Sequence, residues 1–549
     1  MLVTTLIWLV VGGAVFGYAR LYSGRRHSRI ENLPVEVILG DVYGGLLSVA
    51  ALLLAVSLRW PLTWWVGLLT LAPGLFVLLQ SGTPYFASQS RIVNSRWLLV
   101  LLPSALFLST REVSLYDTAL YHQQAVNWLS NFGLVRGLAL LHFRLGFTSS
   151  WFALAAPINN GELAGRVAGI VGGLLPGVMV VAVAAVIFRW VFFHGCSLRT
   201  LSWGMFCAGL LVVEIIWNVE ASLSPDVVVW LLPIAVATIM TDDTAAIADR
   251  VGKATFVATL GCLAKLSALP VLCYALVFST LALVRGGSRM KVGAWLVASL
   301  AALVLLVSAN IRVSGCPIFP SSVGCTSSDW SVDVSVARDI EKDIALYARS
   351  QNRVENEVWP LLAAAGIATI VALVTQRSNV FVRHALAVSW VGIVAVLFQA
   401  PNPRFGLGYF MLPLAIGVAS LASGEFSHRL TSFADRGVPF VRAHTISISV
   451  LLWTLACGVS ASQMTELGDL VYPRRMASAD GDPIYLKNQR VNRRVNFSLA
   501  RESRPGFQVV RPLRSDQCWN AALPCSPGVT VESIGLRDPR RGLVAGFVK

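Results

Sequence analysis

The sequence has little charge for its length. Only 13% of its 549 residues are charged, about half of the roughly 25% found in soluble domains. Hydrophobic residues make up 55%, with 17 Trp and 25 Phe, and this richness excludes an intrinsically disordered chain. A soluble core stops growing at about 250–300 residues, and no core of any size needs so little polar surface. The composition therefore predicts a polytopic membrane protein.

Several motifs of known chemistry are also missing. The sequence has no phosphate-binding P-loop, no HExxH, no dinucleotide fingerprint and no paired CxxC. ATP-driven transport and a structural zinc site therefore lack their usual marks, and we expect no metal and no cofactor. The net charge of +15 first concerns orientation in a bilayer, so no nucleic-acid partner is expected.

Apolar runs long enough to cross a bilayer recur along the chain. They predict an all-α polytopic fold with about fourteen spans, within a range of twelve to fourteen. The predicted spans are 2–19, 42–58, 62–80, 97–110, 165–188, 201–217, 226–240, 253–268, 270–284, 292–309, 359–375, 380–399, 407–422 and 446–460.

The basic residues of the short loops predict the orientation. Arg20, Arg25 and Arg26 follow the first span and no basic residue precedes it, which favours an uncleaved anchor with its N-terminus outside. Alternation then divides the chain into N-terminal helices (1–110), a large outside segment (111–164), a bundle (165–460) and an outside tail (461–549). The bundle includes a second outside segment, 310–358.

Two close pairs of cysteines fall in these outside segments. Cys316 and Cys325 share one segment, and Cys518 and Cys525 share the tail. Because charge counting places both pairs on the oxidising side of the membrane, we expect two disulfides. The alternative is four unpaired thiols, since spacing alone does not establish geometry.

The densest group of polar residues follows the fourth predicted span. In a regular helix, Asp117, Tyr121, Gln124 and Trp128 would share one face. A carboxylate, a phenol, an amide and an indole together are typical of sugar sites, and Asp117 would be the general base. Alternatively, Asp117 caps a helix that begins at Thr118 and the aromatic residues form an interfacial belt.

Other charged residues fall on the same predicted side. Arg136, His142 and Arg144 are candidates to hold a lipid phosphate, or else snorkelling side chains. Three more candidates lie near span ends: Asp226 in Ser222–Asp226, Lys265 in Cys262–Pro270, and Arg404 in Pro401–Phe405. Their alternatives are a first-turn acid, a snorkelling lysine and a solvated arginine in a plain turn.

These landmarks resemble the C-type (GT-C) glycosyltransferases, multi-pass enzymes such as the protein O-mannosyltransferases and the lipid A aminoarabinose transferase. The resemblance rests on Asp117, Tyr121 and His122 after an early span, on Lys265–Pro270, and on Pro401–Phe405. It is closest to a bacterial branch that shares the Gly315–Pro320 and Cys518–Cys525 segments. The chain differs in having four predicted spans before the acidic segment and no paired acids there.

The resemblance implies a glycosyltransferase of the bacterial inner membrane with its active site facing the exterior. It would transfer a sugar from a polyprenyl-phosphate donor to a glycan, lipid or protein acceptor. Asp117 would be catalytic, and eight residues would bind substrate: Tyr121, His122, Gln124, Trp128, Arg144, Asp226, Lys265 and Arg404. The alternatives are a polymerase or ligase acting on undecaprenyl-pyrophosphate glycans through Arg and His, and a lipid or sugar transporter without chemistry.

Overall fold

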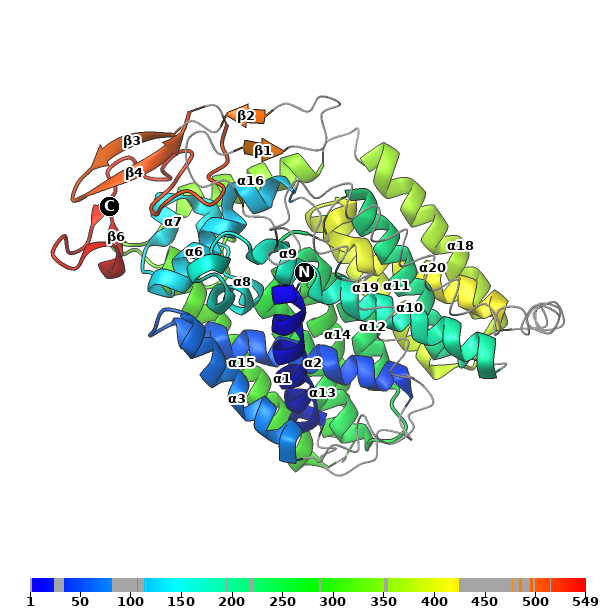
Figure 1. Cartoon of the computed structure of the whole chain (residues 1–549). Helices are drawn as coiled ribbons and strands as arrows, with labels where there is room; N and C mark the ends of the chain where they lie inside the picture. Colours follow the sequence, from blue (N-terminus) through cyan, green and yellow to red (C-terminus); the bar gives the residue numbers. More distant parts are fainter. Residues whose placement is uncertain are drawn as a thin grey trace.

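Helices dominate the computed structural model of the chain (Figure 1). The structure describes residues 2–23, 34–80, 106, 113, 115–193, 196–217, 219, 221–285, 288–349, 354–423, 473, 476, 483–485, 494–496, 499–513 and 515–549. The bundle helices are α1 (Leu2–Ser23), α2 (Val35–Ser57), α3 (Trp64–Gln80), α9 (Val167–Gly172), α10 (Leu174–Phe193), α11 (Leu198–Trp217), α12 (Asp226–Met240), α13 (Ile247–Ala264), α14 (Leu269–Val284), α15 (Arg289–Ser314), α18 (Trp359–Thr375), α19 (Val380–Gln399) and α20 (Pro403–Ala422).

Eight helices of the described residues are long and apolar enough to cross a membrane, as expected of a multi-pass membrane protein. Helices α3 and α12 are shorter apolar helices. The predicted span at 446–460 lies outside the described residues, as does 97–110 except for Leu106, so the count of fourteen stays a prediction.

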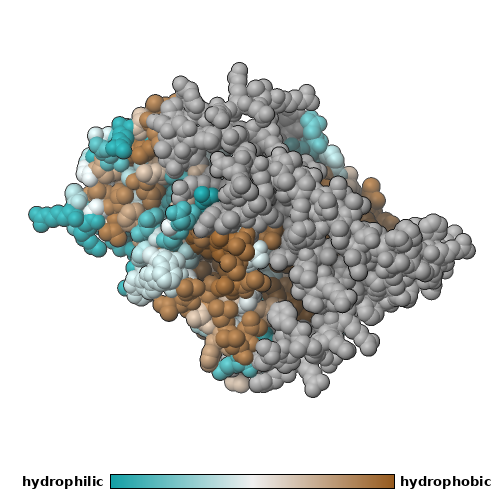
Figure 2. Space-filling model, in the orientation of Figure 1, coloured by the Kyte–Doolittle hydropathy of each residue, from teal (hydrophilic) through white to brown (hydrophobic). Residues whose placement is uncertain are grey.

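The bundle surface exposes apolar side chains as a lipid-facing surface would. Leu69 of α3 is 65% exposed and Val374 of α18 is 78% exposed. Figure 2 shows a brown hydrophobic area over the helices, with teal hydrophilic residues at either end of it. This distribution suits a band of helix surface in contact with acyl chains.

The segment predicted as the first outside loop folds into short helices at one end of the bundle. They are the π-helical turn η2 (Thr118–His122), α6 (Gln123–Phe132), α7 (Leu138–Leu141), η3 (Phe143–Gly146), α8 (Ser150–Ala155), η4 (Ala156–Ile158) and η5 (Gly161–Leu163). Two connections add the turns η6 (Leu266–Ala268) and η7 (Val354–Val358), and the segment after α15 adds α16 (Val334–Ala348).

The tail forms three antiparallel pairs of short strands, which are β1 (Pro483–Tyr485) with β2 (Arg494–Asn496), β3 (Leu499–Arg504) with β4 (Phe507–Pro512), and β5 (Gly535–Leu536) with β6 (Phe547–Val548). The turn η9 (Gly542–Ala545) precedes β6. Residues 508–510 lie in β4, whereas 529–534 forms turns and bends. In that stretch the amides of Thr530 and Val531 donate to the Leu140 carbonyl rather than to a strand.

The three predicted outside segments lie together at the same end of the bundle. In Figure 1, α6, α7 and α16 lie beside β3, β4 and β6. The Phe547 amide donates to the Arg136 carbonyl over 3.0 Å, and the Lys549 amide donates to that of Asp329 over 2.8 Å. These bonds join segments that charge counting had placed on one side of the membrane.

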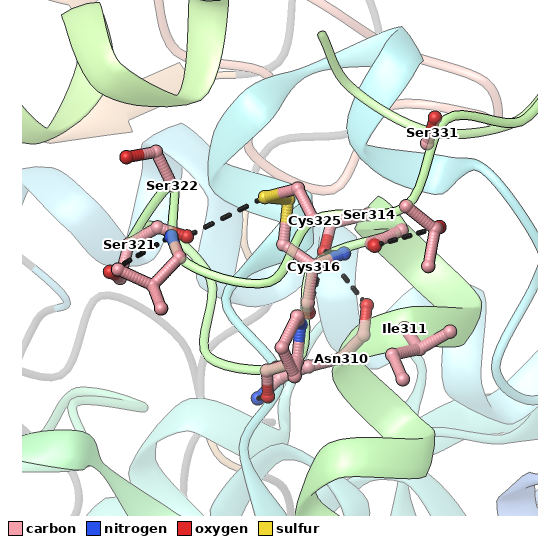
Figure 3. The surroundings of a disulfide bond; sticks show 12 residues. Asn310, Ile311, Ser314, Cys316, Ser321, Ser322, Cys325 and Ser331 are labelled. Atoms are coloured by element: carbon pink, nitrogen blue, oxygen red, sulfur yellow. Dashed lines mark hydrogen bonds between the residues drawn. A yellow bond between two sulfur atoms is a disulfide. The ribbon is translucent and has the colours of Figure 1, made fainter. Parts of the chain in front are cut away.

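Both predicted disulfides are present. Cys316 is joined to Cys325 directly after α15, and Cys518 is joined to Cys525 in the tail. Figure 3 shows the first of them, where the Ser314 hydroxyl accepts a hydrogen bond from the Cys316 amide over 3.1 Å and Asn310 donates to the Pro317 carbonyl. The expectation from charge and cysteine spacing is therefore confirmed.

Candidate functional site

Four of the predicted site residues come from separate segments and meet at one end of the bundle. Asp117 directly precedes η2, Asp226 is the first residue of α12, Lys265 directly follows α13, and Arg404 is the second residue of α20. We call Asp117, Asp226, Lys265 and Arg404 the ion cluster. Each of these residues stands where a helix begins or ends, and none lies in the middle of an apolar helix.

Arg404 joins the two carboxylates of the ion cluster. Its Nη1 lies 2.7 Å from Oδ2 of Asp117, and its Nε lies 2.6 Å from Oδ2 of Asp226. Lys265 Nζ pairs with the other carboxylate oxygen of Asp226, and the Ser224 hydroxyl donates to Asp226 over 2.8 Å. Two cations and two anions are therefore bound into one network whose formal charges cancel.

The ion cluster is closed at one side and open at the other. The Asp226 side chain is 1% exposed, whereas those of Asp117, Lys265 and Arg404 are 23%, 25% and 26% exposed. The Lys265 ammonium also lies 4.7 Å from the centre of the Phe405 ring. A ligand can therefore reach the three partly exposed charged groups. The buried Asp226 carboxylate holds Lys265 and Arg404 in place.

The start of α20 places Arg404 where it meets Asp226. Asn402 accepts a hydrogen bond from the Arg404 amide over 3.0 Å, and Pro403 occupies the first turn, so the helix begins here. The Trp230 indole of α12 donates to the Arg404 carbonyl over 2.8 Å. A Cβ on Gly408 would lie 2.2 Å from the Trp230 carbonyl oxygen, so glycine permits this close approach of α20 to α12.

Neither capping nor solvation explains these side chains. Asp117 makes no capping hydrogen bond at η2, and Asp226 is used by Lys265 and Arg404. Arg404 is held by two carboxylates, so the plain turn with a solvated arginine is wrong. The alternatives of a helix cap for Asp117 and a solvated side chain for Arg404 are therefore replaced by one shared network of ion pairs.

Asp117 is ionised at neutral pH. Burial is the largest influence and would raise the pKa of its carboxyl, but Arg404, His122 and Arg144 together outweigh burial and hold that pKa below its ordinary value. The carboxylate can accept a hydrogen bond from a ligand hydroxyl, and it is only a weak base.

Aromatic rings lie beside Asp117. The Tyr121 ring is 6.0 Å from that of Phe147 and 6.3 Å from that of Phe152, both edge to face. His122 is fully buried, and burial lowers its pKa to about 3, so its ring is neutral at pH 7. Tyr121 is partly exposed and thus the member of this pair that a ligand can contact.

Arg144 is a cation near Asp117 that has no acidic partner among the described residues. Its guanidinium lies 5.3 Å from the centre of the Phe143 ring and acts electrostatically on Asp117. Within the part of the chain that the structure describes, no carboxylate oxygen lies within 4.0 Å of it. Its neighbour His142 is 7% exposed, and burial lowers its pKa to about 4.

Gln124 and Trp128 do not join the ion cluster. Gln124 donates to the carbonyls of Trp519 and Ala521 in the tail, over 3.1 and 3.0 Å. Trp128 is fully buried, with its ring 5.8 Å from that of Phe547. The prediction that these residues share one helical face with Asp117 is wrong. Residues 118–122 form a π turn, in which the Gln123 amide donates to the Thr118 carbonyl, so the register of later residues shifts.

Sequence reasoning missed the residues that support the ion cluster. Ser224, Trp230 and Phe405 each contact a charged member. Ser224 and Phe405 lay in segments that the sequence singled out, whereas Trp230 did not. Among the described residues, no group of three or more His, Cys, Asp and Glu side chains is placed to hold a metal ion.

Comparison with known families assigns the chain by sequence. Residues 1–411 match the family described as a domain of unknown function, DUF8201. The chain belongs to this family. The match spans all four residues of the ion cluster and ends before the tail. No curated protein and no solved structure matches the chain, so the family carries no activity over to it.

Proposed function

We propose that the chain is a membrane glycosyltransferase of GT-C type, which transfers a sugar from a polyprenyl-phosphate donor to an acceptor hydroxyl. The observation that carries the proposal is the ion cluster: a carboxylate, a guanidinium and an ammonium, all partly exposed, meet beside aromatic rings at one end of an apolar bundle. A lipid-linked donor requires a polar site at such a boundary.

In this proposal the cations hold the donor phosphate. Arg144 faces no carboxylate among the described residues, and a guanidinium binds phosphate through paired N–H donors. Arg404 offers five N–H donors, and its ion pairs with Asp117 and Asp226 are made by Nη1 and Nε. Lys265 adds an ammonium with three donors.

Asp117 would act on the acceptor. Its carboxylate accepts the proton of the acceptor hydroxyl while the hydroxyl oxygen bonds to the anomeric carbon of the sugar. The bond from that carbon to the phosphate oxygen breaks, and the lipid phosphate leaves with the electron pair, so the configuration inverts. A weak base suffices because the phosphate is a good leaving group, and general-base catalysis contributes about 10²–10⁴-fold.

The test is lipid phosphate release by the full chain in lipid nanodiscs, with a panel of polyprenyl-phosphate sugars and an acceptor extract from bacterial envelopes. Asp117→Asn is expected to lower the rate at least about 100-fold. The matched control is Asp339→Asn, because Asp339 is 71% exposed on α16 and is expected to leave the rate unchanged. Release by neither protein with any donor would overturn the function, and full activity of Asp117→Asn would overturn the role of Asp117.

The same assay separates the polymerase or ligase alternative, which requires Arg144 and His142 rather than an aspartate. That alternative predicts large losses in Arg144→Ala and His142→Ala with undecaprenyl-pyrophosphate glycans, and activity in Asp117→Asn. The structure favours it less, because His142 is buried and neutral at pH 7. We further propose that the ion cluster faces the exterior of a bacterial inner membrane.

A further inference from the structure

A second group of cations, separate from the ion cluster, lies at the same end of the bundle. Arg59 follows α2, Arg136 lies between α6 and α7, and Arg312 lies in the last turn of α15. We call these three residues the arginine cluster. They come from parts of the chain that are far apart in sequence, so the fold brings them together.

Backbone hydrogen bonds fix this arrangement. The Leu134 amide donates to the Ser57 carbonyl over 2.8 Å, which holds the end of α2 against residues 133–136. Arg312 Nε donates to the Leu134 carbonyl over 2.5 Å, and the Gly137 amide donates to the Arg312 carbonyl over 3.0 Å. The three arginines therefore share one small and well-connected part of the molecule.

No acid neutralises the arginine cluster within the described ranges. None of its guanidinium groups has a carboxylate oxygen within 4.0 Å among those residues, and Arg59 and Arg136 both act electrostatically on Arg312. The nearby Asp329 and Asp333 are used by Arg537 and Lys549 instead. Placing like charges together without a counter-ion costs free energy, which an anionic ligand would offset.

Arg136 and Arg312 are also held in place by the side chains and backbone around them. The Arg136 guanidinium lies 4.7 Å from the centre of the Trp330 ring, and stacking of this kind leaves the N–H edge of a guanidinium available. Arg312 uses Nε for Leu134, and its terminal nitrogens make no hydrogen bond with any residue that the structure describes. Arg59 is exposed, so the cluster can be reached from outside the protein.

Exposed tryptophans indicate where the arginine cluster lies relative to the lipid headgroups. Trp60 is 60% exposed directly after Arg59, and Trp64 and Trp65, which begin α3, are 62% and 50% exposed. Tryptophan gathers at the level of the lipid headgroups, where one side of the indole is apolar and the other is wet. The guanidinium groups therefore lie at the level of lipid phosphates.

We propose that the arginine cluster binds the phosphate of an anionic membrane glycerophospholipid, with its acyl chains along the apolar surface near α3. The site is independent of the glycosyltransferase proposal, since it shares no residue with the ion cluster. Guanidinium groups suit this ligand because they bind phosphate oxygens through two N–H donors at once.

The test measures lipid binding to the full chain in a neutral detergent by native mass spectrometry. Phosphatidylglycerol is compared with phosphatidylcholine and with inorganic phosphate. We expect phosphatidylglycerol to bind the wild type, and Arg59→Gln with Arg136→Gln to weaken that binding at least about tenfold, because the phosphate loses hydrogen bonds from charged donors.

Two further variants keep the test decisive. Arg289→Gln with Arg377→Gln removes the same charge from exposed sites in other parts of the bundle and should leave binding unchanged, whereas Arg59→Lys with Arg136→Lys should retain most of it. Equal binding of the two phospholipids, an equal loss in the control variant, or saturation by inorganic phosphate alone would overturn the proposal.

Discussion

The first outside segment contributes to two polar clusters that differ in charge and in access to solvent. The ion cluster is made of formal charges, and three of its members are about one quarter exposed. The other, which we call the amide cluster, consists of Gln123, Asn127, Asn159 and Asn520. Gln123, Asn127 and Asn159 are buried, with at most 7% of each residue exposed.

The members of the amide cluster hydrogen-bond mainly to one another, and Gln123 Oε1 is buried without a partner among the described residues. Gln123 Nε2 lies 2.9 Å from Asn127 Oδ1 and 3.1 Å from Asn159 Oδ1, and Asn127 Nδ2 donates to Asn520 Oδ1 over 3.1 Å. Neutral amides buried in this way specify how the tail docks. The ion cluster instead keeps donors and acceptors that are partly exposed. We therefore assign the proposed reaction to the ion cluster and the docking of the tail to the amide cluster.

The largest predicted loss of stability comes from removing the buried acid of the ion cluster. Asp226→Ala leaves Lys265 without its partner and Arg404 with only Asp117, so the free energy of unfolding should fall by about 3–5 kcal/mol. Asp117→Asn should change it by no more than about 1 kcal/mol, because that pair is partly exposed. Equilibrium denaturation in mixed micelles measures both changes in the free energy of unfolding. Equal losses would contradict the assignment of Asp226 to stability and of Asp117 to the proposed reaction.

The next largest effect concerns the disulfide that closes the loop facing the amide cluster. Cys518→Ser with Cys525→Ser should destabilise the protein by about 2 kcal/mol, the loss expected for such a short loop. This loop carries the Trp519 amide that donates to the Ala119 carbonyl over 2.7 Å, so the proposed activity should fall as well. The matched control is Cys316→Ser with Cys325→Ser, which should lose stability without this extra loss of activity.

A smaller effect is expected within the amide cluster itself. Asn520→Ala leaves the amides of Gln123 and Asn127 with one acceptor fewer, which costs about 1.5 kcal/mol of stability. The activity per folded molecule should stay within about twofold, because Asn520 does not touch the ion cluster. Asn131→Ala is the control, since Asn131 is exposed, and a specific loss of activity in Asn520→Ala would give the amides a role in chemistry.

The smallest effect is a dependence of stability on pH through His122. Its pKa is about 3 in the folded protein against the ordinary 6.5, so the unfolded state takes up the proton first. Stability is therefore complete above pH 6.5 and is lost as the pH falls from there toward 3. Between pH 7 and 5.5 the loss that comes from His122 should be about 1 kcal/mol. His122→Gln should remove that part and leave the part that the buried His142 contributes. An unchanged pH profile in that variant would contradict the buried neutral ring.

The sequence predicted site residues best in segments where charged residues are rare. Asp226, Lys265 and Arg404 stood out because each interrupts or borders an apolar run, and the structure joins them with Asp117. The π turn at 118–122 has no such signal, so the placement of Gln124 and Trp128 was not predictable. The amide cluster also escaped prediction, because Asn127 and Asn520 are nearly 400 residues apart and neutral amides are common in loops.

The docking of the tail has a consequence for the order in which the protein matures. The Phe547 ring packs against Trp128, and its amide bonds to the Arg136 carbonyl. The segment that carries Asp117 thus acquires its contacts with Phe547 only after residues 515–549 have been synthesised and have reached the same side of the membrane. A nascent chain that ends after α20 would still lack this support, so this segment is completed later than the bundle.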